Sequence, residues 1–182
     1  MKGKLVIISA PSGCGKTTVC GRLTQMPNIK KSISVTTRAP RAYEKDGVHY
    51  HFISRDEFYK RIDEGRFVEY AEYCGNLYGT DLSSLTKALE DGLIYILEID
   101  VHGALQICKK FPDAITIFLM PPDEETLEKR LIKRNANNKA EVDERLEIAK
   151  DEYEYRDHYK YCIVNDKLDE TIKEICRVLE LK

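Results

Sequence analysis

The sequence lacks a long apolar run, a paired-cysteine motif and a marked excess of either charge, and each absence excludes a class of protein. No apolar segment approaches the roughly 18 residues that a membrane-spanning helix needs, so we expect no membrane attachment. The six cysteines include no C-x-x-C pair, which argues against a zinc site or a disulfide framework and predicts reduced thiols in a cytoplasmic protein. A net charge of −2 gives no general affinity for nucleic acid.

What the 182 residues do contain is an alternation of strand and helix patterns, at a length suited to one domain. Such alternation predicts an α/β fold, in which helices cover both faces of a parallel sheet in three layers. We expect strands at Lys4–Ser9, Leu93–Ile99, Ala114–Met120 and Tyr161–Val164. We expect helices at Lys16–Gln25, from Val101 to about Phe111, after Asp123, around Val142–Ala149 and from Leu168.

Residues 34–82 break this alternation and predict a small mixed α+β insertion. The signals are two alternating strand patterns, two turns and one helix start: Val48–Ile53, Phe67–Tyr73, Asp46-Gly47, Gly75-Asn76 and Ser54-x-x-Glu57. We therefore predict one domain over residues 1–182, with its core at 1–33 and 83–182. The polar stretch Asn135–Lys139 has few core-forming residues, which predicts a loop.

Residues 10–17 follow the first apolar strand and read Ala-Pro-Ser-Gly-Cys-Gly-Lys-Thr, with alanine where the usual motif begins with glycine. Glycines here let backbone N–H groups turn toward an anion, and the following helix adds its positive N-terminal end. Lys16 can reach the β- and γ-phosphates, and the Thr17 hydroxyl can ligate Mg²⁺. We expect a nucleoside triphosphate to contact Ala10, Pro11, Ser12, Gly13, Cys14, Gly15, Lys16, Thr17 and Thr18.

The insertion holds groups suited to a second phosphate. Arg38 and Arg41 stand three residues apart and can grip one phosphate through bidentate, charge-assisted hydrogen bonds. The hydroxyls of Tyr50 and Tyr78 can complete the grip without adding net charge. Surface arginines and core tyrosines are the alternative interpretation of these four residues.

Over nearly its whole length the sequence resembles the guanylate kinase family. The stretches that carry the resemblance are Ile8–Gly13, Ser34–Arg41, Asp46–Phe52, Tyr78–Thr80, Ile99–Gly103 and Ile163–Asp166. The resemblance implies a P-loop core, a GMP-binding insertion and a short lid at about 134–145. It also implies that the γ-phosphoryl group of ATP is transferred to GMP, and to dGMP, with Mg²⁺.

The resemblance assigns roles in the acceptor site residue by residue. It gives the GMP phosphate to Arg38, Arg41, Tyr50 and Tyr78, the guanine to Ser34, Glu69 and Thr80, and Asp100 to the base or the metal. The chemistry agrees, because the adjacent N1–H and 2-amino donors of guanine suit one carboxylate, and its O6 suits hydroxyls. Glu69 lies in phase with Phe67 and Ala71 in an alternating strand, which predicts a buried face; a solvated strand carboxylate is the alternative.

The remaining candidates surround the triphosphate. Asp100 ends an apolar strand and suits a carboxylate that orients Mg²⁺ through water, or alternatively caps the next helix. The resemblance implies that Arg134 and Arg145 belong to the lid and that Asn165 approaches the adenine. Arg130 is a weaker candidate, because a solvated helix face also explains it. The residues that we expect to be catalytic are Lys16, Arg38, Arg134 and Arg145.

The sequence thus predicts an ATP:GMP phosphotransferase of nucleotide metabolism. A guanylate-kinase-like interaction module is one alternative, but Lys16 and Thr17 are intact in the phosphate loop. A GTP-binding switch is another, but it needs an Asn-Lys-x-Asp motif, and the nearest string, Asn165–Asp169, has the wrong order. A kinase for another nucleoside monophosphate is disfavoured by Glu69 and Thr80.

Overall fold

The computed structural model describes residues 3–134 and 139–181, without the side chains of residues 134 and 139–141. The chain forms two compact units, each made of several chain segments. Unit 1 contains the residues up to Leu5 with Asn28–Leu97 and His102–Ala114, and unit 2 contains Val6–Pro27, Glu98–Val101 and the residues from Ile115 onward. Within the described ranges, no helix has the length and apolar character needed to cross a membrane.

The sheet is parallel, as the sequence predicts, but has five strands where the sequence predicts four; their order is β2-β7-β1-β8-β9. Its strands are β2 (Ile29–Lys31), β7 (Ile94–Glu98), β1 (Lys4–Ser9), β8 (Ile115–Met120) and β9 (Tyr161–Val164). The runs in β1 and β8 are almost entirely buried, because both faces of a parallel sheet are covered.

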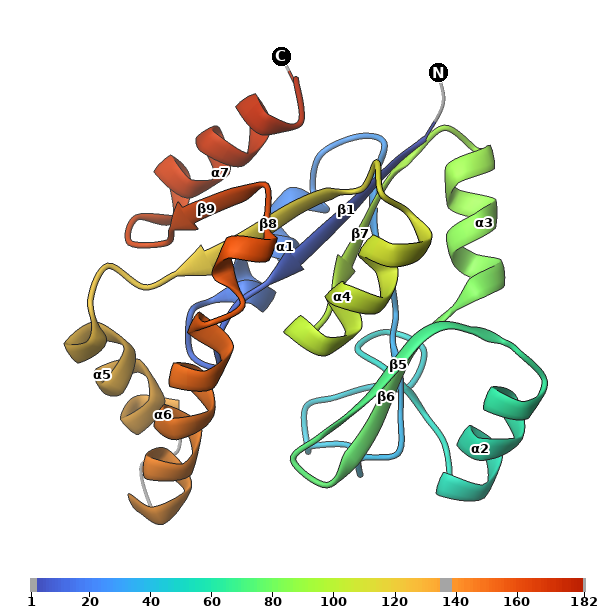
Figure 1. Cartoon of the computed structure of the whole chain (residues 1–182), viewed down its shortest axis with the longest axis horizontal. Coiled ribbons are helices and arrows are strands. Elements are labelled where there is room, and N and C mark those ends of the chain that lie inside the picture. The colour runs from blue at the N-terminus through green and yellow to red at the C-terminus, as the bar shows by residue number, and fades with distance from the viewer. Residues whose placement is uncertain (1–2, 135–138, 182) are drawn as a thin grey trace. The chain divides into compact units, whose positions relative to one another are not determined.

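Unit 2 contains β8 between β1 and β9, with Ile117 opposite both Ile8 and Tyr161. Its helices are α1 (Lys16–Leu23), α5 (Glu124–Arg134), α6 (Lys139–Tyr153), the 3-10 turn η1 (Arg156–His158) and α7 (Leu168–Val178), which Figure 1 shows. The start of α5 is as predicted, because Asp123 Oδ1 accepts the Thr126 N–H at 2.6 Å. An aspartate in this position satisfies one of the first N–H groups of the helix.

Unit 1 contains β2 and nearly all of β7, with Ile29 opposite Ile94. It also contains the helix α3 (Leu82–Glu90) and, from His102 onward, the helix α4 (Val101–Lys110). The sequence prediction missed both β2 and α3. Strand β2 has only three residues, too few for a periodic pattern. Helix α3 did carry a signal, because Asp81 accepts the Ser84 N–H at 2.9 Å and caps the helix.

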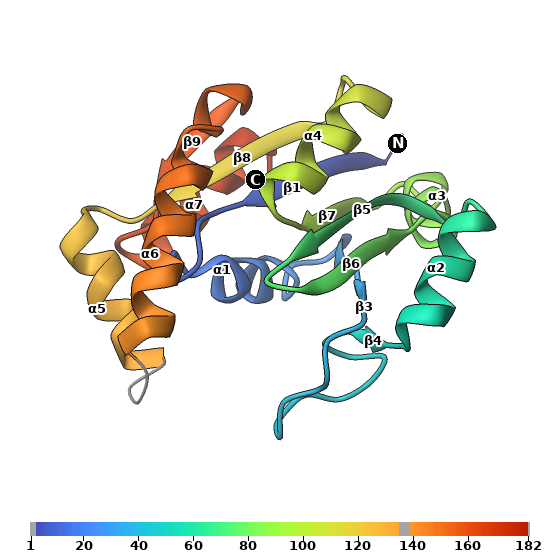
Figure 2. The same ribbon diagram turned by 60° about the horizontal axis from the view of Figure 1, so that its bottom comes forward.

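A second, mixed sheet in unit 1 has the order β4-β3-β6-β5. Its elements are β3 (Val35–Thr36), β4 (His51–Phe52), α2 (Arg55–Asp63), β5 (Phe67–Tyr73) and β6 (Asn76–Asp81). Ser54 caps α2 as predicted, accepting the Glu57 N–H at 3.2 Å, and Figure 2 shows α2 alongside the β5–β6 hairpin. One face of this sheet packs on α2, where the rings of Phe58 and Phe67 stack with centroids 4.5 Å apart. A Cβ at Gly79 would lie 2.9 Å from Phe67, so this packing requires glycine.

The predicted strand Val48–Ile53 is wrong over its first half. Residues 47–49 form a turn, and only His51–Phe52 are paired as β4. The turn is closed by Gly47, which has φ of 70° and donates its N–H to the Tyr50 carbonyl at 2.8 Å. His49 Nδ1 accepts the Lys45 N–H at 3.0 Å, and such local hydrogen bonds compete with strand pairing.

Candidate nucleotide sites

The loop at residues 10–17 in unit 2 has the backbone of an anion site. Gly13 and Gly15 have φ of 90° and 84°, in the left-handed region that favours glycine. Gly15 directly precedes α1, and a Cβ on it would lie 2.6 Å from Asn165 Nδ2. The left-handed φ of Gly15 and the lack of room for a Cβ beside Asn165 both require glycine at this position. Since the first N–H groups of a helix have no partner within it, the start of α1 offers donors to phosphate oxygens.

The side chains of the loop divide into buried supports and accessible polar groups. Ala10, Pro11 and Cys14 are buried, whereas Thr17 and Thr18 are exposed. Lys16 Nζ makes two long hydrogen bonds to described residues, 3.5 Å to the Ala10 carbonyl and 3.4 Å to the Ile99 carbonyl. Its ammonium group therefore lies beside the loop without a short ionic partner among these contacts.

Two oxygen-bearing side chains suited to a cation, Thr17 and Glu98, meet at the start of α1. Thr17 Oγ1 donates to Glu98 Oε1 at 2.5 Å, which leaves the lone pairs of the hydroxyl oxygen available. Asp100 follows two residues after Glu98, and its carbonyl accepts Ser9 Oγ at 3.5 Å. In the described parts of the chain, no group of three or more His, Cys, Asp or Glu side chains could hold a metal ion. These residues suit Mg²⁺, which binds to few protein oxygens and completes its shell with water and phosphate.

Asn165 supports the loop from the end of β9. Its side chain is buried; Nδ2 donates to the Cys14 carbonyl at 2.7 Å, and Oδ1 accepts Thr171 Oγ1 at 3.0 Å. Arg130 Nη1 in turn donates to the Asn165 carbonyl at 3.1 Å, and the arginine is half-buried. The adenine contact predicted for Asn165 stays a prediction.

Helix α6 contacts the same loop from another side. Arg145 Nη1 donates to Ser12 Oγ at 3.1 Å, so this predicted lid arginine lies at the phosphate loop. The side chain of Arg134 and residues 135–138 of the predicted loop lie outside what the structure describes. The predicted loop is wrong at Lys139, which is the first residue of α6. Of the two lid arginines, the structure thus places one.

The last turn of α6 adds a buried carboxylate and a phenol that the sequence prediction missed. Glu152 accepts the Ser12 N–H, and its Oε2 has no hydrogen-bond partner among the described residues. Burial raises the pKa of Glu152 to about 7, although Lys16 opposes the shift. The Tyr153 hydroxyl donates to the Cys14 sulfur, and burial raises the pKa of the Cys14 thiol to about 12. Cys14 is therefore a protonated, poorly reactive thiol at neutral pH.

In unit 1, two of the three residues predicted to bind guanine are paired in the mixed sheet, and the third directly precedes β3. Thr80 pairs directly with Glu69, and its Oγ1 donates to Glu69 Oε1 at 2.5 Å. Val35 pairs with Gly79 in the antiparallel β3–β6 ladder, and Ser34 directly precedes Val35, outside β3. Side chains of directly opposed residues share one face of a sheet. Glu69 is only 3 % exposed, which confirms its predicted burial.

A break in the β5–β6 register decides which way Glu69 faces. Phe67 pairs with Asp81 and Glu69 with Thr80, so Val68 is an extra residue between them. The predicted common phase of Phe67 and Glu69 is therefore wrong: Phe67 packs against Phe58 in the α2 core, whereas Glu69 meets Thr80 on the other face. A bulge shifts the strand by one residue, and a period-2 pattern cannot reveal it.

The four residues predicted to hold the acceptor phosphate also come together. Arg38 lies 5.3 Å from the centroid of the Tyr50 ring and donates to the Tyr78 hydroxyl, and the two tyrosine rings are 6.0 Å apart. Glu44, which the sequence prediction missed, accepts Arg38 Nη2 at 2.8 Å and the Arg41 N–H at 2.8 Å. Burial alone would raise the pKa of Glu44, but these hydrogen bonds outweigh it and hold the pKa below its usual value. The signal in the sequence that could have identified Glu44 is its position three residues after Arg41.

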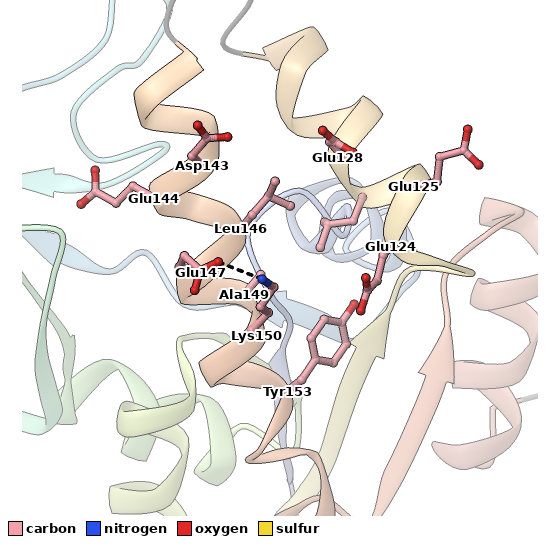
Figure 3. Close-up of a pocket in the computed structure, with 11 residues that line it drawn as sticks. Glu124, Glu125, Glu128, Asp143, Glu144, Leu146, Glu147, Ala149, Lys150 and Tyr153 are labelled. Atoms are coloured by element: carbon pink, nitrogen blue, oxygen red, sulfur yellow. Dashed lines mark hydrogen bonds and ion pairs between the residues drawn. The ribbon is translucent and has the colours of Figure 1, made fainter.

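A cleft of about 630 Å³ lies between α5 and α6, and Figure 3 shows its largely acidic lining. The carboxylates there are Glu124, Glu125, Glu128, Asp143, Glu144 and Glu147. Lys150 Nζ lies 2.8 Å from Glu147 Oε1. Negative charge of this density repels phosphate groups, so the cleft is not a candidate nucleotide site.

The parallel sheet and the glycine loop before α1 define a P-loop nucleotide-binding protein. Within that class, the chain belongs to the guanylate kinase family, whose model, described as guanylate kinase, matches residues 2–182. A guanylate kinase of Clostridium perfringens strain 13 is 44 % identical over 190 residues, covering 100 % of this chain and 88 % of the relative. A guanylate kinase of Desulfitobacterium hafniense is 41 % identical over 178 residues, covering 97 % and 89 %. The crystal structure of guanylate kinase from Anaplasma phagocytophilum matches with a TM-score of 0.83 at 35 % identity, covering 98 % of this chain and 85 % of that one.

Proposed function

We propose that this chain transfers the γ-phosphoryl group of ATP to the 5′-phosphate of GMP or dGMP, giving ADP and GDP or dGDP. Membership of the guanylate kinase family supports the reaction. The observation that carries the choice of acceptor is the buried Glu69–Thr80 pair in unit 1, which also holds the Arg38 cluster. We further propose a cytoplasmic enzyme whose partners are these nucleotides.

For the acceptor, we assign the GMP phosphate to Arg38, Arg41, Tyr50 and Tyr78, and the base to Ser34, Glu69 and Thr80. The Glu69 carboxylate accepts N1–H and the 2-amino group together. Adenine would instead turn the lone pair of its N1 toward this carboxylate. Because a buried polar site with unpaired groups is costly, we expect discrimination by roughly 10⁴-fold.

For the donor, we assign the phosphates to the loop N–H groups and Lys16, with Arg145 and Arg134 at the transferring group. Thr17 and Asp100 are the proposed Mg²⁺ residues, Asp100 acting through water, and Glu98 orients the Thr17 hydroxyl. Bound Mg²⁺ neutralises charge on the β- and γ-phosphates. Asn165 fixes the loop through Cys14.

The chemistry needs no general base. The second pKa of a phosphate monoester is about 6, so the acceptor oxygen of GMP is already largely ionised at neutral pH. Catalysis then depends on in-line positioning and on charge neutralisation by Lys16, Arg38 and Arg145. Water competes for the γ-phosphoryl group, so we expect ATP hydrolysis to be slow when GMP is absent.

A coupled assay of ADP release with GMP, AMP, UMP and CMP tests the proposal. We expect turnover with GMP and very little with the other three nucleotides. Turnover with another nucleotide but not with GMP would refute the base assignment. Binding of GMP without any ADP release would identify an interaction module instead of an enzyme.

A further inference from the structure

Strand β5, which carries Glu69, is an edge strand of the mixed sheet, and α4 contacts its open edge within unit 1. The Gln106 side chain pairs with the backbone of Tyr70: Nε2 donates to the Tyr70 carbonyl at 2.7 Å, and Oε1 accepts the Tyr70 N–H at 3.3 Å. A side-chain amide here makes the two hydrogen bonds that a neighbouring strand would make. Figure 1 shows α4 above the β5–β6 hairpin.

A second side chain of α4 contacts the strand on the other side of Glu69. Lys110 Nζ donates to the Val68 carbonyl at 2.5 Å. Val68 is the extra residue of the bulge, and a bulge locally disrupts the ladder. Gln106 and Lys110 stand four residues apart and so share one face of the helix. Together they contact the residue before Glu69 and the residue after it.

This contact matters because the bulge sets the direction of Glu69. With the bulge in place, Phe67 packs against Phe58 and Glu69 meets Thr80 on the opposite face. A shift of one residue would exchange the two faces. The β6 side of β5 is fixed by the ladder, and α4 fixes its other side.

We propose that Gln106 and Lys110 are positioning residues for base recognition, which hold the bulged backbone of β5 so that the Glu69 carboxylate faces the guanine donors. The inference rests on the proposed function, since it takes Glu69 as the base-reading group. Neither residue needs to touch the nucleotide. Both act through the strand.

The test compares Gln106→Met and Lys110→Met, which keep side-chain length and remove the hydrogen bonds. Lys109→Met is the matched control, because Lys109 is an exposed residue of the same helix and loses the same charge. We expect Gln106→Met and Lys110→Met each to raise KM for GMP by about 3- to 10-fold and to leave KM for ATP unchanged. The preference for GMP over IMP, which lacks the 2-amino group, should fall by a similar factor. Lys110→Arg, which restores donors, should recover the preference.

A double-mutant cycle separates positioning from general stability. In a Glu69→Gln background the Gln106→Met change should have little further effect on KM for GMP, because no carboxylate remains to be positioned. Equal losses for GMP and IMP, or full additivity in the cycle, would overturn the proposal. Titration of GMP and IMP binding gives the same ratio without turnover. It therefore tests this inference even if the wild-type chain does not phosphorylate GMP, a result that would refute the proposed reaction alone.

Discussion

The candidate phosphate sites of the two units use different hydrogen-bond donors. In unit 2 the donors are backbone N–H groups of one continuous loop, whose shape depends on Gly13 and Gly15. In unit 1 the donors are the guanidinium groups of Arg38 and Arg41, and Glu44 holds both in place. The first site is fixed by backbone conformation and the second by an ionic network.

This difference predicts where each site is sensitive. A backbone site tolerates changes in most side chains but not an added Cβ at a left-handed glycine. A site of charged side chains depends on its neighbours, because each guanidinium needs an anion to hold it while no phosphate is bound. We therefore expect the site in unit 2 to be impaired by an added Cβ at a loop glycine, and the site in unit 1 by the loss of a charged side chain.

The largest expected effect concerns the one charged side chain that the loop uses. Lys16→Met should lower kcat by about 10³-fold, because the transferring phosphoryl group loses a fixed positive charge. GMP binding in unit 1, measured by calorimetry, should not change. Near-normal turnover by this variant would contradict the donor assignment.

The corresponding change in unit 1 is Glu69→Gln, which should lower kcat/KM for GMP by about 10²-fold or more through the loss of charge-assisted hydrogen bonds. KM for ATP should stay constant. Glu72→Gln is the control, because Glu72 is an exposed residue of the same strand. An equal fall in kcat/KM for GMP at both positions would show that the effect comes from the charge of the strand and not from base recognition.

Glycine substitutions sharpen the comparison at the backbone. Gly15→Ala should destabilise the protein by about 1–3 kcal/mol, since it combines φ of 84° with a Cβ 2.6 Å from Asn165. Gly21→Ala, in open space on α1, should instead stabilise it by about 0.5–1 kcal/mol. Urea unfolding measures both. The same sign for the two variants would be inconsistent with the loop geometry.

The buried carboxylate beside the loop predicts a pH dependence that unit 1 should not share. The pKa of Glu152 is raised by burial from 4.5 to about 7, so between these values the native state binds more protons than the unfolded state. The free energy of unfolding should therefore fall as pH rises through this window, by at most about 3 kcal/mol. Glu152→Gln should remove this slope in thermal unfolding between pH 4.5 and 8. A variant with the wild-type slope would assign the pH dependence elsewhere.

The smallest effect concerns two thiols, one in each unit. Cys14 is buried with a raised pKa, whereas Cys74 is exposed in the β5–β6 turn. At neutral pH, iodoacetamide should modify Cys74 and leave Cys14 unmodified, with no loss of activity. Mass spectrometry of the digested protein locates the label. Early modification of Cys14 would show that the loop opens.

The sequence predicted the glycine turn between β1 and α1 because its signal lies in eight consecutive residues after a strand. Phosphate binding by this loop stays a proposal. The strand Phe67–Tyr73 was predicted with its correct bounds, and the apolar strands of the parallel sheet within about one residue of theirs. Ser34, Glu69 and Thr80 come from three separate segments of the chain, and only the family resemblance brought them together. Its residue roles remain proposals.

What the sequence did not predict depends on partners distant in the chain. The bulge at Val68 exists only relative to β6, so the phase of Glu69 was predicted wrongly. Glu98 and Glu152 are ordinary acidic residues until the fold places them beside Thr17 and Ser12. The turn at residues 47–49 was predicted as a strand because the alternation of apolar and polar residues carries no information about hydrogen bonds from side chains to the nearby backbone.

The contact between α4 and β5 also bears on self-association. An edge strand with unpaired backbone groups can template the addition of a strand from another molecule, which leads to aggregation. Here the Tyr70 N–H and carbonyl are already occupied by Gln106, and a lysine covers the Val68 carbonyl. Helix α4 thus covers this part of the β5 edge against the addition of a foreign strand.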